Sequence, residues 1–238
     1  MDSLCEMTAT DLRRMIGRKD ISPVEIVEAS IERIETTDPS LNAVVTKNYE
    51  GARKAAKAAE KDVLDGEMLG LLHGLPIGIK DLEATAGLRT TLGSRLYADH
   101  VPTTDQGVVS NVREAGGVIL GKTNTPEFGA GANTRNLLFG ATGNPFNPAK
   151  TCGGSSGGSA VALAAGMVSL ASGSDYGGSL RTPAGFCGVV GIRPSPGIVA
   201  AETRPVGLLP FSVLGPMGRT VEDANLLLQA QMGPNPHD

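Results

Sequence analysis

The clearest periodic pattern in the sequence lies near its N-terminus. Ser22, Pro23 and Glu25 form a capping box with proline at the first helical position. Apolar residues then recur at helical intervals as far as the Asp-Pro pair at residues 38–39, at positions Val24, Val27, Ile31 and Ile34. This pattern predicts an amphipathic helix.

Helical and strand patterns alternate along the chain. Further helices are expected at residues 11–16, 50–64 (ending at Gly66), 107–115, 159–166 and 220–232. Short apolar runs predict strands at residues 43–46, 75–79, 118–120, 168–171 and 189–192. The alternation predicts an α/β fold, in which helices cover both faces of a sheet.

The composition narrows the class of protein. Of 238 residues, 40% are hydrophobic and 19% are charged, and 21 basic against 25 acidic residues give a net charge of −4. This apolar content supports a core and excludes global disorder. Because phosphate binding needs clustered basic residues, nucleic acid is not expected as a partner. With no linker between Gly66 and Gly197, one domain is expected.

The lack of a visible secretory signal and the small number of cysteines favour a cytoplasmic protein. The N-terminus shows no secretory signal. The chain has three cysteines, Cys5, Cys152 and Cys187. They are too few for a disulfide framework and lack the spacing of zinc ligands. Residues 151–174 carry no charge, but twelve of them are glycine or serine. Their apolar part is too short to span a bilayer, so no membrane partner is expected.

Two short motifs match known patterns but lack the required context. Residues 116–123 fit the phosphate-loop pattern GxxxxGK[ST], yet their middle is itself a predicted strand, so they are interpreted as a helix-to-strand turn. Residues 153–157 fit the GxSxG nucleophile elbow, with Ser155 as nucleophile. That fold needs a downstream acid and histidine, and the only later histidine is His237.

A larger constellation combines two glycine-serine clusters with an upstream lysine. The clusters occupy residues 151–160 and 173–183, each where a loop is expected to turn into a helix. Glycines leave the backbone N–H groups open to developing negative charge, as an oxyanion hole requires. Lys80, expected at the carboxyl end of a strand, is the candidate base, because burial would lower its pKa. A pairing of lysine and serine would suffice for nucleophilic catalysis.

The order and spacing of five segments carry a family resemblance. They are residues 78–81 (GIKD), 121–129 (GKTNTPEFG), 144–148 (NPFNP), 153–160 (GGSSGGSA) and 177–188 (GGSLRTPAGFCG). With them the chain resembles the amidase signature family, from the first helix to Val221. The fold expected is a three-layer α/β/α sandwich around a mixed, largely parallel sheet, with a helical segment over residues 1–65 and a catalytic core over residues 66–238.

The resemblance implies a triad of nucleophile, bridging serine and base. Ser179 would be the nucleophile, Ser155 the bridging serine after a cis peptide bond, and Lys80 the base. Backbone N–H groups of Tyr176, Gly177 and Gly178, with that of Ser179, would form the oxyanion hole. Ser156 is expected to form a hydrogen bond with Lys80, and an ion pair is expected to support the Ser179 loop, between Asp175 and Arg181. No metal or other cofactor is required.

The implied function is hydrolysis of a small-molecule carboxylic amide through an acyl-serine intermediate. Two alternatives stay open: the A-type subunit of a glutamine-dependent transfer-RNA amidotransferase, and a catalytically silent binding or assembly remnant. Family members are about twice as long, so the fold is expected to be incomplete at its C-terminus, with a homodimer or a missing C-terminal half as the partner. Tyr176 is larger than the usual residue, and Arg193 replaces the usual lysine, a change expected to lie away from the chemistry.

Overall fold

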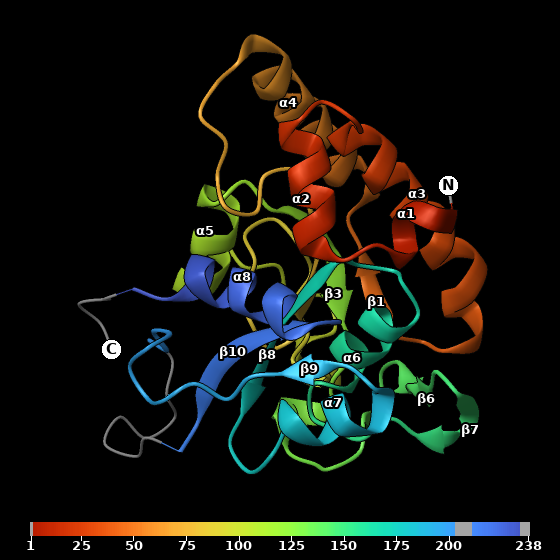
Figure 1. Cartoon of the computed structure of the whole chain (residues 1–238). Helices are drawn as coiled ribbons and strands as arrows, with labels where there is room; N and C mark the ends of the chain where they lie inside the picture. Colours follow the sequence, from red (N-terminus) through yellow and green to blue (C-terminus); the bar gives the residue numbers. More distant parts are fainter. Residues whose placement is uncertain (1, 203–210, 234–238) are drawn as a thin grey trace.

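A six-stranded mixed sheet forms the centre of the protein (Figure 1). The computed structural model describes residues 2–202 and 211–233, so His237 lies outside the described residues. The strands follow the order β1-β3-β2-β8-β10-β9. They are β1 (Val44–Lys47), β2 (Pro76–Lys80), β3 (Val118–Thr123), β8 (Leu170–Asp175), β9 (Val190–Gly191) and β10 (Val213–Gly218).

The strand directions confirm the expected mixed, largely parallel sheet. Strand β2 pairs in parallel with both β3 and β8, whereas β1, β10 and β9 are added through antiparallel pairs. Four of the six strands, β3, β2, β8 and β9, therefore run in the same direction. Because β2 and β8 are neighbours, their carboxyl ends deliver residues far apart in sequence to the same edge of the sheet.

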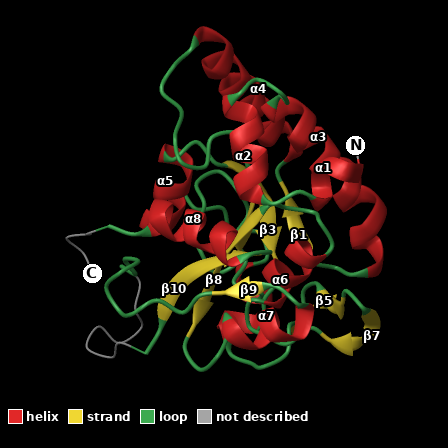
Figure 2. Cartoon of the chain, viewed as in Figure 1, coloured by secondary structure: helices red, strands yellow, loops and turns green. Residues whose placement is uncertain are grey.

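Helices cover both faces of this sheet, as Figure 2 shows. Their bounds are α1 (Asp2–Glu6), α2 (Ala9–Gly17), α3 (Pro23–Thr37), α4 (Tyr49–Asp65), α5 (Gly107–Glu114), α6 (Gly157–Ala164), α7 (Arg181–Cys187) and α8 (Val221–Gln231). Short 3-10 turns occupy Asp38–Ser40, Arg95–Tyr97 and Glu127–Gly129. Two small hairpins pair β4 (Arg135–Asn136) with β5 (Gly140–Ala141), and β6 (Gly143–Asn144) with β7 (Asn147–Thr151).

Alternation along the strands divides the core into two apolar clusters. In β3, Val118 and Leu120 belong to one cluster and Ile119 to the other, because successive side chains point to opposite faces of the sheet. Helix α6 packs in the first cluster, and α5 and α8 pack in the second. Within the described ranges, no helix is both long enough and apolar enough to cross a membrane.

Local sequence signals account for the helix that the periodicity predicts most clearly. At the start of α3, Val24 N–H donates to Ser22 Oγ at 3.0 Å, and Ser22 N–H donates to Glu25 Oε2 at 2.8 Å. These bonds satisfy N–H groups that the first helical turn leaves free. At the end of α4, Gly66 has a φ of 78°, a left-handed conformation that favours glycine.

Several strands differ from the sequence prediction, and β8 and β10 matter most for the site. Strand β8 begins at Leu170 and continues beyond the apolar run to Asp175, because its polar residues pair with β10. Strand β10 is absent from the sequence prediction, and it contains Pro216, which cannot donate to a ladder. The carbonyl of Pro216 nevertheless accepts from Ile192 N–H at 3.1 Å, so β10 joins β8 to β9.

Candidate active site

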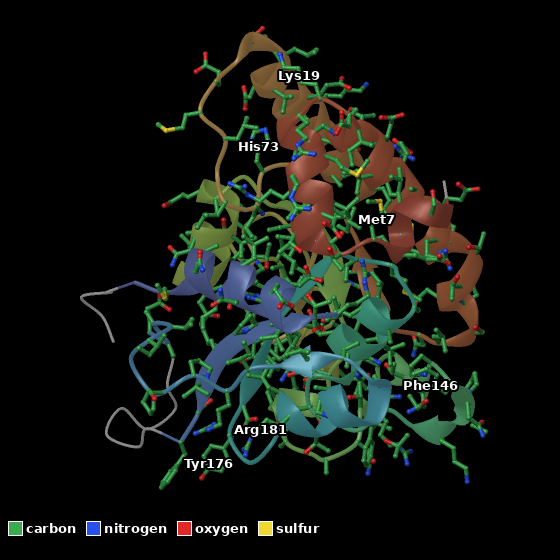
Figure 3. All side chains as sticks on the ribbon, in the orientation of Figure 1. Met7, Lys19, His73, Phe146, Tyr176 and Arg181 are labelled. Atoms are coloured by element: carbon green, nitrogen blue, oxygen red, sulfur yellow. The ribbon has the colours of Figure 1, made fainter. Side chains whose placement is uncertain are left out.

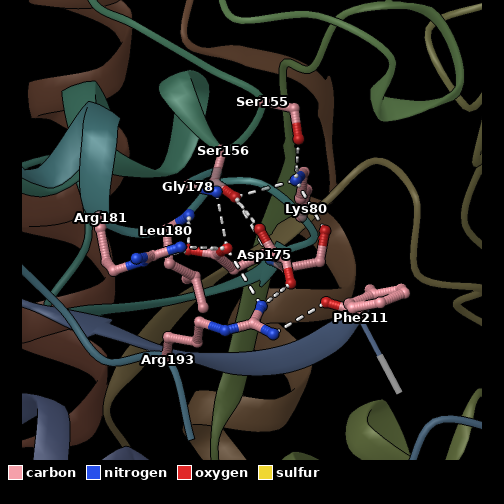
Figure 4. A network of polar contacts seen from close by, with 10 residues as sticks. Lys80, Ser155, Ser156, Asp175, Gly178, Leu180, Arg181, Arg193 and Phe211 are labelled. Carbon is pink, nitrogen blue, oxygen red and sulfur yellow. Dashed lines mark hydrogen bonds and ion pairs between the residues drawn. The ribbon is translucent and has the colours of Figure 1, made fainter. Parts of the chain in front are cut away.

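The end of β2 places Lys80 inside the protein, surrounded by hydroxyl groups. The lysine is fully buried, and its Nζ lies 2.8 Å from Ser155 Oγ and 2.9 Å from Ser156 Oγ (Figure 4). It also lies 2.8 Å from Ser174 Oγ. Burial lowers the pKa of Lys80 to about 7, against the opposing charges of Glu83 and Asp175. A neutral amine in this position has two N–H donors and one lone pair, so it can accept a proton from a hydroxyl.

The glycine-serine loop before α6 supplies two of these hydroxyls. The peptide bond between Gly154 and Ser155 is cis. Ser156 donates its N–H to the carbonyl of Ser179 at 3.1 Å, and its Oγ lies 3.2 Å from the carbonyl of Ser174. The structure therefore brings the first glycine-serine cluster against both Lys80 and the second cluster.

A buried carboxylate organises the second cluster. Asp175 accepts from the N–H groups of Gly178 at 2.7 Å and Leu180 at 3.2 Å, and from both Nε and Nη2 of Arg181 at 3.0 Å (Figure 4). Burial opposes ionisation of Asp175, but the Arg181 guanidinium and the two backbone N–H groups outweigh burial and lower the pKa of the carboxyl well below its usual range. The expected ion pair between Asp175 and Arg181 is present.

Arg193 also belongs to this network, contrary to the expectation that it lies away from the chemistry. Its Nη1 donates to the carboxylate of Asp175 at 3.1 Å and to the Asp175 carbonyl, and its Nη2 donates to the carbonyl of Phe211 at 2.9 Å. The expectation was wrong because β10 pairs with β8 and β9 pairs with β10, which brings the segment after β9 to the end of β8. No local sequence signal records that return.

The predicted nucleophile and oxyanion donors lie together on the loop between β8 and α7. Ser179 is half-buried, Gly178 is buried, and Tyr176 and Gly177 are exposed. The N–H of Gly178 points to Asp175 rather than toward a free site, because the carboxylate closes the short turn after β8. Tyr176, 66% exposed, packs its ring edge-to-face on Phe211 at 5.9 Å between centroids.

The two serines of the expected triad, Ser155 and Ser179, are not joined by a side-chain hydrogen bond in this structure. Among the described residues, no hydrogen bond joins Ser155 Oγ to Ser179 Oγ, and Ser179 is tied to the cluster through its carbonyl. Ser174 was missed at the sequence level, because an apolar strand pattern ending at residue 171 hides its position on β8. Its hydroxyl completes the group around Lys80.

The other motifs do not form sites of their own. Lys122, in the phosphate-loop pattern, is fully buried in β3 and donates to the carbonyl of Glu83 and to Thr85 Oγ1, so it cannot reach a phosphate. His73 lies 2.9 Å from the carbonyl of Ala59, at the opposite end of the view from Arg181 in Figure 3. The described part of the chain holds no cluster of three or more His, Cys, Asp or Glu suited to a metal ion.

Known proteins are similar to this chain in sequence and in the arrangement of their elements. The family model described as Amidase matches residues 25–238. The chain is 43% identical to the A-type subunit of the glutamyl-tRNA(Gln) amidotransferase of Carboxydothermus hydrogenoformans and 42% identical to an acylamidase of Rhodococcus erythropolis, over 98% of this chain in each case. A bacterial aryl acylamidase of the amidase signature enzymes superposes with a TM-score of 0.93, at 39% identity over 98% of this chain. The chain spans 48%, 49% and 49% of these three proteins.

Proposed function

The chain belongs to the amidase signature family, and we propose that it hydrolyses a small-molecule carboxylic amide to an acid and ammonia or an amine. The observation that carries the proposal is the fully buried Lys80, whose Nζ meets three serine hydroxyls and, among the described residues, no carboxylate within hydrogen-bond distance. Such surroundings favour a neutral amine, which is the form that a base requires.

The proposed first half-reaction relays protons along Lys80, Ser155 and Ser179, forms one C–O bond and breaks the C–N bond. Ser155 gives its proton to Lys80 and takes the proton of Ser179, whose Oγ attacks the carbonyl carbon of the amide. The protonated Lys80 then returns its proton, through Ser155, to the departing nitrogen. The C–N bond breaks, and the acyl group stays on Ser179. Hydrogen bonds of this kind often close only when the substrate binds, which accounts for the open link between the two serines.

Water completes the second half-reaction in the same way. Lys80 and Ser155 take a proton from water, the hydroxide oxygen attacks the acyl carbon, and the acid leaves as Ser179 regains its proton. Backbone N–H groups would hold the oxyanion in both steps: those of Tyr176, Gly177 and Ser179. Each such donor contributes roughly 3 kcal/mol in the transition state. The N–H of Gly178, bonded to Asp175, would hold the loop in shape instead.

Covalent labelling tests this proposal. The full chain is treated with a fluorophosphonate and its intact mass is measured, alongside Ser179→Ala and Lys80→Ala. We expect one adduct on the native sequence and none on either variant, because the first lacks the nucleophile and the second lacks the base. An adduct that survives in Ser179→Ala, or a folded chain without any adduct, would contradict the proposal.

A second candidate function rests on the amidotransferase relatives. The relative from Carboxydothermus hydrogenoformans matches as well as the acylamidase does, and the same triad would release ammonia from glutamine for transfer to transfer RNA. Comparing ammonia release from glutamine with hydrolysis of simple aryl amides separates the two. Preference for glutamine would favour the amidotransferase function. If neither reaction occurs although the chain binds a partner, the binding-remnant alternative holds.

Partners and location belong to the same proposal. The relatives are about twice as long as this chain, so we propose either a homodimer or association with a separate C-terminal half. Light scattering of the chain alone and mixed with the second half distinguishes these arrangements. Cys152 and Cys187 are buried as free thiols, which fits a reducing compartment, and we propose the cytoplasm.

A further inference from the structure

A second set of ionisable side chains is buried directly behind Lys80. Glu83 lies in the turn after β2 and is 1% exposed, and Asp81 beside it is also 1% exposed. Lys122, on the neighbouring strand β3, is fully buried and donates to the backbone carbonyl of Glu83. Two lysines and two acids thus share the interior, so the charge of each affects its neighbours.

The carboxyl group of Glu83 is only half satisfied. Its Oε2 accepts from Ser172 Oγ, whereas its Oε1, also buried, has no hydrogen-bond partner among the described residues. An ionised carboxylate with a bare oxygen is costly in the interior. Burial accordingly raises the pKa of Glu83 to about 7, although Ser172 and the lysines favour the charged form.

A single hydroxyl connects this carboxyl group to Lys80. Ser172, on β8, accepts from the backbone N–H of Lys80 at 3.0 Å while it contacts Glu83. Strands β2 and β8 are paired here, with Gly78 opposite Ala171. The position of Glu83 is therefore fixed relative to the strand end that carries Lys80, and it is held there by neighbouring strands.

Two carboxyl groups in the described part of the chain act on the charge of Lys80, and they differ in kind. Asp175 is ion-paired with Arg181 and Arg193, so it stays ionised over the ordinary pH range. The cations that act on Glu83 are instead the two buried lysines, Lys80 and Lys122. The groups that contact Nζ of Lys80 are neutral serine hydroxyls. Glu83 is consequently the neighbour whose charge changes in the same pH range as the charge of Lys80.

We propose that Glu83, joined through the Ser172 hydroxyl to the main chain of Lys80, is a positioning residue that controls whether the Lys80 ammonium loses its proton. An ionised Glu83 stabilises the ammonium by Coulomb attraction, and a protonated Glu83 removes that attraction. The catalytic meaning of this control rests on the proposed amidase function. The charge of Lys80, however, is measurable without turnover.

Nuclear magnetic resonance of the full chain, labelled with 13C at the lysine Cε, tests the proposal directly. Loss of one signal in Lys80→Ala assigns Lys80. In the native sequence we expect its titration to follow two coupled steps. In Glu83→Gln, which keeps the shape and removes the charge, we expect a single step with a midpoint lower by about one pH unit.

Asp81→Asn is the matched control, because it also removes one buried carboxyl from the same turn. Asp81 acts on Lys122 and is bonded to Thr91. Loss of the Asp81 carboxylate is expected to shift the titration midpoint of Lys122 and to leave the Lys80 midpoint unchanged. An unchanged Lys80 midpoint in folded Glu83→Gln, or an equal shift in Asp81→Asn, would overturn the proposal.

Ser172→Ala provides an independent variant that deletes a single hydroxyl. Because that hydroxyl stabilises the Glu83 carboxylate, its loss should lower the Lys80 midpoint in the native background and leave it unchanged when Glu83 is already Gln. A shift that persists in the double variant would contradict a route through Glu83. Failure of fluorophosphonate labelling would overturn the amidase proposal and leave these midpoints interpretable. If labelling succeeds, its rate can be measured as a function of pH. The acidic limb of that profile should then shift together with the midpoint of the Lys80 titration.

Discussion

Asp175 joins two guanidinium groups that are exposed to very different degrees. The side chain of Arg181 is 56% exposed and that of Arg193 is 24% exposed, whereas the carboxylate between them is fully buried. Solvent screens an exposed ion pair, so its contribution to stability is small. Arg193 also donates hydrogen bonds to the backbone carbonyls of Asp175 and Phe211. A smaller side chain would leave both carbonyls without this donor.

We therefore expect Arg193→Ala to lower the free energy of unfolding more than Arg181→Ala does. The predicted loss is about 2–3 kcal/mol for Arg193, and the loss for Arg181 is expected to be much smaller. Urea unfolding followed by circular dichroism measures both. Equal losses would mean that the hydrogen bonds from Arg193 to the backbone contribute little.

Residue types in sequence predict much of this site, but not its long-range contacts. Lys80, Ser155 and Ser156 are singled out by motif and spacing, and the structure places them within hydrogen-bond distance. Ser174 and Arg193 are missed because each reaches the site through strand pairing. Pairing registers depend on segments distant in sequence, and a local pattern does not encode them.

Helix α6 is held close to the sheet by glycine. Gly158 N–H donates to the carbonyl of Asn124 at 3.1 Å, and a Cβ at Gly158 would lie 2.7 Å from that oxygen and 2.8 Å from the carbonyl of Ala43. Real Cβ atoms do not approach backbone atoms so closely, so only glycine fits. The close approach also fixes the loop that carries Ser155.

Gly158→Ala is accordingly expected to destabilise the fold by more than about 2 kcal/mol. Gly185, in α7, is the matched control, since nothing lies within 4 Å of a Cβ built there. Gly185→Ala should be neutral or stabilise by about 0.5–1 kcal/mol, because alanine restricts the unfolded chain. Thermal unfolding compares the two variants. A Gly158→Ala protein as stable as Gly185→Ala would show that α6 can move away from the sheet.

Element boundaries show where local propensity is insufficient. Helix α3 agrees with its prediction, because capping and periodicity act within one segment. Strand β8 extends through serine and glycine, which have little tendency to form strands, because β10 supplies the ladder. The hairpins of residues 135–151 were missed as well, since each has only two paired positions and the second hairpin is irregular in register.

At the scale of the whole molecule, the buried ionisable groups govern how stability depends on pH. The pKa of Glu83 rises from 4.5 to about 7 on folding, so between these values the folded chain binds more protons and stability falls as pH rises. The pKa of Lys80 falls from 10.5 to about 7, so above pH 7 the unfolded chain binds more protons and stability rises with pH.

The combination predicts a minimum in the free energy of unfolding near neutral pH. We expect values about 1–2 kcal/mol higher on the acidic and alkaline sides, at about pH 5 and pH 9, than at about pH 7. Urea unfolding at the three pH values measures the profile. In Glu83→Gln the acidic side should flatten while the alkaline rise remains. A maximum near neutral pH would contradict the assignment of these buried charges.

The pairing of β2 with β8 also affects the order of steps during folding. Lys80 and Ser174 are 94 residues apart in the chain, yet they share a hydrogen bond. Closing so long a loop is a slow step of folding, because chain entropy must be lost before any contact compensates for it. A partly folded chain with formed helices but unpaired β2 and β8 does not enclose Lys80 among the serine hydroxyls. Under the proposed mechanism, nucleophilic reactivity would therefore return during refolding only after β2 and β8 have paired.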